Sequence, residues 1–151
     1  MDFTTADLCD EHPQLISVLD PLFRNYGGTE RFSGPVETVQ VYEDNAIVRE
    51  TLETQGKGRV LVVDGGGSLR CALIGGRLGQ LAQRNGWSGL LINGCVRDTV
   101  ELARITIGVR ALNAVPMRSA KERKGSIGTV VSFAGVSFTP GKVLYADADG
   151  L

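Results

Sequence analysis

The sequence has few of the residues that build metal clusters, disulfide frameworks or membrane spans. Its 151 residues include one histidine and three cysteines, which are Cys9, Cys71 and Cys95. The cysteine count is odd and the spacing fits neither a zinc site nor a disulfide framework, so we expect a reducing, cytoplasmic setting. No apolar run exceeds four residues, whereas a bilayer span needs roughly 18. The first residues, MDFTT, lack the basic and apolar regions of a secretory signal.

Net charge is also small, at -1, but the charges separate along the chain. Residues 1–54 carry 11 acids and 3 bases, whereas residues 55–125 carry 12 bases and 4 acids. The basic middle could attract an anionic substrate, nucleic acid or an acidic partner. Alternatively, the two segments lie against each other, within or between subunits. The basic run at 121–124 has no interleaved aromatic residues for base stacking, so we expect a solvated loop and no direct nucleic-acid binding.

Glycine, in contrast, is abundant. The chain has 20 glycines, 11 of them within residues 56–94. Composition and periodicity predict helices at 5–10 (capped by a Thr), 45–54, 68–73 and 78–85, a loop at 26–35, and strands at 36–41, 60–63, 89–92, 109–115, 129–133, 136–138 and 143–146. The strand–helix–strand unit from 60 to 92 predicts parallel pairing, with the loops after both strands at one edge of the sheet. We therefore expect one layered, mixed α/β domain over residues 1–151.

The double glycine Gly75-Gly76 lies between two predicted helical stretches. Glycine weakens a helix interior, so the pair predicts a break followed by a restart. A restarted helix exposes free backbone N–H groups, which can bind an anion such as a carboxylate. The alternative is a close contact between helix and strand that needs small residues.

A second candidate site follows the strand at 89–92. Arg97 offers a planar fork for a carboxylate or enolate oxygen, and Asp98 offers a hard oxygen ligand for Mg²⁺. The alternative is that Asp98 and Glu101 form a capping box at the start of the next helix. The two roles do not exclude each other.

Three other features are weaker candidates. The loop 64–68, DGGGS, follows a strand but matches neither a dinucleotide fingerprint nor a P-loop, and Asn93 stands where a cofactor-binding acid would follow the second strand. Tight turning and close packing explain its glycines equally well. His12 is expected at the surface, and Cys71 and Cys95 in the core.

Several segments together are similar to one known family. They are TADLCD at 5–10, NYGG at 25–28, EDN at 43–45, VLVVDGGGSLR at 60–70, NGW at 85–87, NGCVRD at 93–98 and YAD at 145–147. The chain resembles the family of the regulator of ribonuclease activity A (RraA), which includes class II 4-hydroxy-4-methyl-2-oxoglutarate aldolases. The resemblance covers nearly the whole chain.

The resemblance implies a compact β/β/α layered, swivelling-type fold and a ring-shaped homotrimer with sites between subunits. It also implies a divalent cation, Mg²⁺ or Mn²⁺, held by Asp98, and a substrate bound by Arg97. The backbone that holds the substrate in these aldolases corresponds to Gly75, Gly76, Arg77 and Leu78.

The implied activity is cleavage of 4-hydroxy-4-methyl-2-oxoglutarate, or of 4-carboxy-4-hydroxy-2-oxoadipate, to pyruvate and a 2-oxo acid, with oxaloacetate decarboxylation as a side activity. One departure bears on it: the aldolase pattern has a further Asp at the position of Gly76. The family also suggests two other functions, namely inhibition of a ribonuclease E-type enzyme without catalysis and a methyltransferase of quinone biosynthesis.

Overall fold

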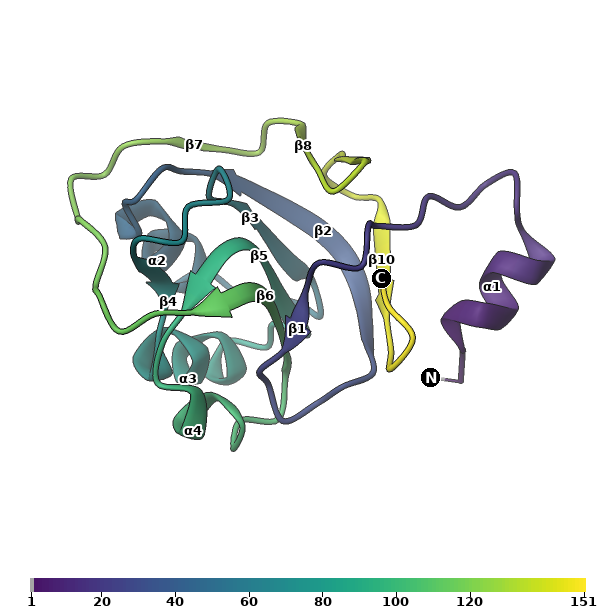
Figure 1. Ribbon diagram of the computed structural model, residues 1–151, viewed down its shortest axis with the longest axis horizontal. Coiled ribbons are helices and arrows are strands. Elements are labelled where there is room, and N and C mark those ends of the chain that lie inside the picture. Colours follow the sequence, from purple (N-terminus) through teal and green to yellow (C-terminus); the bar gives the residue numbers. More distant parts are fainter. Residues whose placement is uncertain (1) are drawn as a thin grey trace.

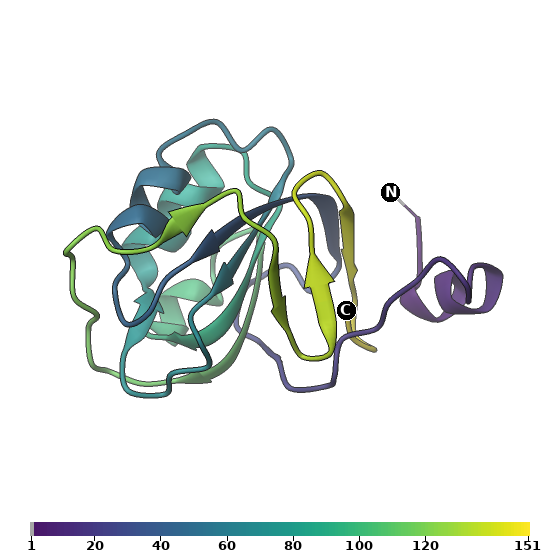
Figure 2. The same cartoon turned by 90° about the horizontal axis from the view of Figure 1, so that it is seen from above.

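A large mixed sheet separates helices α2, α3 and α4 from a small hairpin, so the chain forms three layers (Figures 1 and 2). The computed structural model describes residues 2–151. In that range no helix has the length and apolar character needed to cross a membrane. The layered, mixed α/β architecture predicted from the sequence is confirmed.

The helices are α1 (Thr5–Glu11), α2 (Ala46–Leu52), α3 (Gly76–Arg84) and α4 (Thr99–Leu102). The strands are β1 (Arg24–Asn25), β2 (Phe32–Gln40), β3 (Val60–Asp64), β4 (Ala72–Ile74), β5 (Gly89–Val96), β6 (Gly108–Ala114), β7 (Ser126–Ile127), β8 (Val131–Phe133), β9 (Val136–Phe138) and β10 (Val143–Ala146).

The main sheet has the strand order β1-β6-β5-β3-β2-β10, with β4 paired to β5 and β7 paired to β2. Strands β2, β3, β5 and β6 run parallel, and β10 closes one edge in antiparallel fashion. The parallel pairing of β3 with β5 confirms the central unit predicted from residues 60–92. The antiparallel pairing of β8 with β9 confirms the predicted hairpin.

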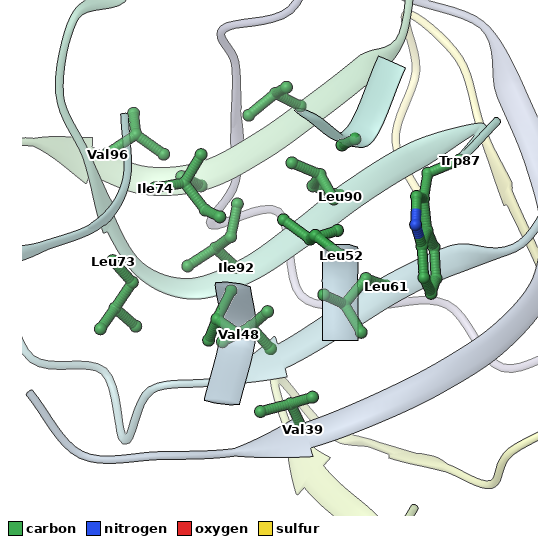
Figure 3. Close-up of a cluster of buried hydrophobic side chains, with 14 of the residues drawn as sticks. Val39, Val48, Leu52, Leu61, Leu73, Ile74, Trp87, Leu90, Ile92 and Val96 are labelled. Carbon is green, nitrogen blue, oxygen red and sulfur yellow. The ribbon is translucent and has the colours of Figure 1, made fainter. Parts of the chain in front are cut away.

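The core lies on both faces of the sheet, which explains why β3 is apolar throughout. Leu61 and Val63 pack on the helix side, whereas Val60 and Val62 pack on the hairpin side. Figure 3 shows the helix-side cluster, in which Leu61 lies near Leu52 of α2. A strand buried on both faces has no polar stripe, and its sequence is a continuous apolar run.

The predicted helix at 68–73 is wrong. Residues 72–74 instead form strand β4, which pairs in parallel with the end of β5. All three residues of β4 are buried, and the Ala72 N–H donates to the Met117 carbonyl. An apolar run this short has no periodicity that separates strand from helix, so tertiary pairing decides its conformation.

The predicted loop at 26–35 ends earlier than expected, because β2 begins at Phe32. The Phe32 ring covers Gly89 and Gly108, where an added Cβ would clash with it. Pro35 is tolerated inside β2 because the pairing with β3 starts only at the next residue, Val36. At this point β2 pairs with the edge strand β10 alone, and a proline inside a sheet is tolerated at an edge.

Ion pairs connect the acidic first third of the chain to its basic middle. Arg59 pairs with Glu37, and Arg123 pairs with Glu50. The Arg123 hydrogen bond holds the pKa of Glu50 below its usual range. The two segments therefore do lie against each other within one chain at these positions, although the exposed pair of Arg123 with Glu50 adds little stability.

Helix α1 is attached to the body mainly through Asp147. The Thr5 N–H and hydroxyl each donate to the Asp147 carboxylate at 2.6 Å, and Thr4 caps the helix by accepting from the Asp7 N–H. The Phe3 and Tyr145 rings pack edge to face. Burial alone would raise the pKa of Asp147, but hydrogen bonds from Thr5 and Asp149 outweigh it and hold the pKa below the ordinary 3.8.

This attachment predicts a stability change with pH. The pKa of Asp147 is lower in the folded protein than in the unfolded chain. Asp147 therefore stabilises the fold fully above pH 3.8, and this stabilisation is lost as the pH falls through its pKa in the folded protein. We expect Asp147→Asn to lower the free energy of unfolding by about 1–3 kcal/mol at neutral pH, and the difference from wild type to shrink toward pH ~2. Urea unfolding at both pH values measures this. The matched control is Asp149→Asn, and an equal loss in that variant would contradict the assignment.

Candidate functional site

Parallel pairing brings the two predicted motifs together at one edge of the sheet. Ile74, at the end of β4, is in register with Val96, at the end of β5. The Arg97 N–H continues this pairing by donating to the Ile74 carbonyl at 2.9 Å. The segments that follow β4 and β5 therefore begin next to each other. One carries Gly75 and Gly76, and the other carries Arg97 and Asp98.

The Asp98 carboxylate caps α3, not its own helix. Its Oδ2 accepts from the Gly76 N–H at 2.8 Å, whereas no side-chain bond caps α4. The predicted capping box with Glu101 is therefore wrong. Asp98 also has a left-handed backbone, with φ 57° and ψ 46°, which is uncommon for a residue other than glycine and is concentrated at functional sites.

The double glycine makes room for two carboxylates. A Cβ at Gly75 would lie 2.7 Å from Asp98 Oδ2, and a Cβ at Gly76 would collide with Glu101 Oε2. Glu101 thus occupies the space that a side chain at position 76 would fill. The sequence does not reveal this role, because the three-residue spacing from Asp98 to Glu101 indicates a capping box.

The sequence predicts that a helix ends before Gly75-Gly76 and that a second helix starts after it. The first part is wrong, because strand β4 precedes the glycines, and the second is confirmed, because α3 begins at Gly76. The Gly76 N–H is occupied by Asp98, and the first intrahelical bond runs from the Gly79 N–H to the Gly75 carbonyl. Within residues 2–151, the N–H groups of Arg77 and Leu78 have no hydrogen-bond partner, which leaves two donors for an anion at this end of α3.

Arg97 lies beside these donors and is half-buried. Its Nη1 donates to the Pro116 carbonyl over 3.4 Å, a long bond that leaves most of the guanidinium available. Asp98 and Glu101 are exposed. The site thus combines two carboxylates, one guanidinium and two backbone donors within reach of solvent.

The two carboxylates of the site are suitable ligands for a hard divalent cation. Across residues 2–151 no group of three or more His, Cys, Asp or Glu side chains is placed to hold a metal. Mg²⁺ usually needs only one or two carboxylates and keeps several waters. The carboxylates of Asp98 and Glu101, which both border Gly76, match that requirement.

The other candidate residues lie apart from this chemistry. Cys71 and Cys95 are buried in the core as predicted, and this burial raises the pKa of both thiols. His12 is exposed beside Glu11. In the glycine-rich loop, the Asp64 carboxylate accepts hydrogen bonds from the Gly66 N–H and the Asn93 side chain. These bonds hold the loop in place and engage the carboxylate.

The cap on α3 can be tested through stability. We expect Asp98→Ala to lower the free energy of unfolding by about 1 kcal/mol, because the Gly76 N–H loses its acceptor. Asp98→Asn retains an acceptor oxygen and should lose less. Urea unfolding measures both variants, with Thr99→Ala as the neighbouring control. A loss in Thr99→Ala as large as that in Asp98→Ala would contradict the capping role.

Comparisons with known proteins identify the family and the fold. A family profile described as RraA-like, aldolase/RraA, matches residues 5–151. A relative from Alkalilimnicola ehrlichii, named "Putative 4-hydroxy-4-methyl-2-oxoglutarate aldolase", is 52% identical over 100% of this chain and 94% of its own. A Geobacillus kaustophilus structure named as an S-adenosylmethionine:2-dimethylmenaquinone methyltransferase has a TM-score of 0.96 at 50% identity, covering 98% of this chain and 92% of its own.

A structure described as the RNA-processing inhibitor RraA, from Thermus thermophilis, also has a TM-score of 0.96. It is 49% identical and covers 99% of this chain and 91% of its own. The chain is thus similar in fold to structures named as a methyltransferase and an inhibitor, and similar in sequence to a relative whose name describes an aldolase. The chain belongs to the RraA-like family.

Proposed function

We propose that the protein is a divalent-metal-dependent lyase that acts on 2-oxo acids through a pyruvate enolate. The single observation that carries this proposal is the meeting of Asp98 and Glu101 at Gly76, beside Arg97 and the free donors of α3. The relatives named as aldolases support 4-hydroxy-4-methyl-2-oxoglutarate as one substrate. Oxaloacetate decarboxylation is proposed as a related activity.

The substrate carboxylate is held by the first turn of α3. The N–H groups of Arg77 and Leu78 point out of a helix N-terminus, where the helix dipole favours a negative group. Arg97 adds a positive charge close to the same point. Gly75 and Gly76 carry no Cβ, which lets the Asp98 and Glu101 carboxylates lie against this turn.

Both reactions break the bond between C3 and C4 of the substrate. In decarboxylation, CO₂ leaves, the C3–C4 bonding pair becomes the C2=C3 double bond, and the π pair of the C2 carbonyl moves to its oxygen, which gives the enolate. In aldol cleavage, the C4 hydroxyl loses its proton and becomes the new carbonyl group, while the C3–C4 pair forms the enolate in the same way. The enolate then takes a proton at C3 and becomes pyruvate.

Asp98 would hold the cation, Mg²⁺ or Mn²⁺, with the Glu101 carboxylate beside it. When bound, the cation supplies Lewis-acid stabilisation of the negative charge that develops on the substrate oxygen. Arg97 stabilises the same charge by direct electrostatic attraction. We propose that Glu101 replaces the aspartate that the aldolase pattern has at position 76, and that its carboxylate accepts and returns the proton.

The activity test is conversion of oxaloacetate to pyruvate, followed by coupled NADH oxidation. We expect turnover with Mg²⁺ or Mn²⁺ and none after EDTA treatment. Asp98→Asn should lower kcat/KM by about 100-fold or more, and Glu101→Gln by about 100-fold. Glu53→Gln, far from the site, is the control. Full activity in EDTA or in Asp98→Asn would disprove the metal assignment, and full activity in Glu101→Gln would disprove the proton role.

The second candidate is inhibition of a ribonuclease E-type enzyme, and the match to the RNA-processing inhibitor RraA favours it. Such inhibition would use surface contacts and no metal. We expect excess protein to slow RNA cleavage by purified ribonuclease E, and Asp98→Asn to inhibit as well as wild type. An unchanged cleavage rate with wild type would rule this function out.

The methyltransferase name of one structural match finds less support in the chain. A methyl-donor site would use the loop after β3, but there the Gly67 N–H donates to the Asn93 carbonyl and Asp64 is held by Gly66 and Asn93. For the assembly, we propose a homotrimer, and for the location the cytoplasm, where free cysteines are stable.

A further inference from the structure

Residues 115–118, which follow β6, border the candidate site. The Val115 N–H donates to the Val96 carbonyl, at the end of β5, over 3.0 Å. Two residues later the Met117 carbonyl accepts from the Ala72 N–H of β4 at 2.7 Å. The segment therefore passes from the end of β5 to β4, which are the two strands that lead into the site.

Arg118 in this segment lies close to Arg97 of the site. Arg97 Nη1 donates to the Pro116 carbonyl, and Arg118 is two residues further on, at most about 7 Å along an extended chain. Arg118 is bridged to Ala72, and Ala72 is paired with Cys95, so these three side chains share one face of the sheet. Arg97 follows Cys95 by two residues and falls on the same face.

The Arg118 guanidinium is available to a ligand. The residue is exposed, and within residues 2–151 it makes no ion pair. Arg59, Arg70 and Arg123, in contrast, each pair with a glutamate. Two neighbouring guanidinium groups repel each other and do not stabilise the fold. They do suit an anionic ligand, because each offers a planar fork to a carboxylate.

We propose that Arg118 selects substrates that carry a second carboxylate. The inference rests on the proposed lyase function, in which the first carboxylate lies at the start of α3 and Arg97 contacts the C2 oxygen. On its other side Arg97 contacts Pro116, so C3 and C4 of the substrate extend toward residues 115–118. A carboxylate attached to C4 then meets Arg118.

Arg118 acts on a carboxylate that the reaction leaves intact. In 4-hydroxy-4-methyl-2-oxoglutarate this group is attached to C4 and stays on the 2-oxo acid that is released. In oxaloacetate, C4 is itself the carboxylate carbon and leaves as neutral CO₂. An arginine that held this leaving group would stabilise the ground state more than the transition state. Arg118 therefore contributes to aldol cleavage more than to decarboxylation.

The test compares two substrates that differ in one group. In 4-hydroxy-4-methyl-2-oxopentanoate a methyl group replaces the second carboxylate, and cleavage gives pyruvate and acetone. Pyruvate from both substrates is measured by coupled NADH oxidation. We expect the wild type to prefer the dicarboxylate. Arg118→Gln should lower the ratio of the two kcat/KM values by about 10- to 100-fold, mainly through a higher KM for the dicarboxylate.

Three further variants locate the effect. Arg118→Lys keeps the charge but loses the fork, so it should recover part of the ratio. Arg84→Gln is the matched control, because Arg84 is also exposed but lies at the other end of α3, and its ratio should equal that of the wild type. Arg77→Gln tests the exposed arginine in the first turn of α3. Circular dichroism checks that each variant is folded.

The outcomes separate this inference from the function on which it rests. A wild type that turns over neither these substrates nor oxaloacetate would remove both. An active wild type without preference for the dicarboxylate would overturn the role of Arg118 alone, and so would an unchanged ratio in Arg118→Gln. A loss of the ratio in Arg77→Gln as large as that in Arg118→Gln would place the second carboxylate at α3 instead.

Discussion

The close approach of α3 to the turn after β5 is the constraint on which the candidate site depends. Gly75 and Gly76 allow it, because a Cβ at either position would strike a carboxylate oxygen. One hydrogen bond, from the Gly76 N–H to Asp98 Oδ2, then fixes the helix start and the acid together. Around that bond lie the two free N–H groups of α3, the Arg97 guanidinium and the Glu101 carboxylate.

The sheet supplies the rigid frame for this arrangement. Parallel strands β4 and β5 end in register, so the turns that follow them lie next to each other. Both faces of the sheet are buried, by helices on one side and by the β8–β9 hairpin on the other. A site built where buried strands end has little freedom to shift, and this suits chemistry that needs fixed positions for charge.

Sequence reasoning predicted the apolar strands, their parallel pairing and the hairpin. Val60–Val63 and Gly89–Ile92 are continuous apolar runs, as is typical of strands in a sheet that is covered on both faces. It failed where tertiary contacts decide conformation: β4 is too short for a periodic signal, and β2 starts early because Phe32 packs on two glycines. It also assigned Asp98 to the wrong helix, since capping by a residue distant in the chain leaves no local pattern. The functional roles of Arg97 and Asp98 remain predictions.

The proximity of Glu101 to Gly76 has a consequence for classifying relatives. An acidic group can be supplied from either of two sites that are far apart in the chain but adjacent in space. A search pattern that demands an aspartate at position 76 would therefore reject chains that keep a carboxylate in the same volume from α4. Paired changes at these two sites, glycine with glutamate or aspartate with a neutral residue, would be the signature of such an exchange.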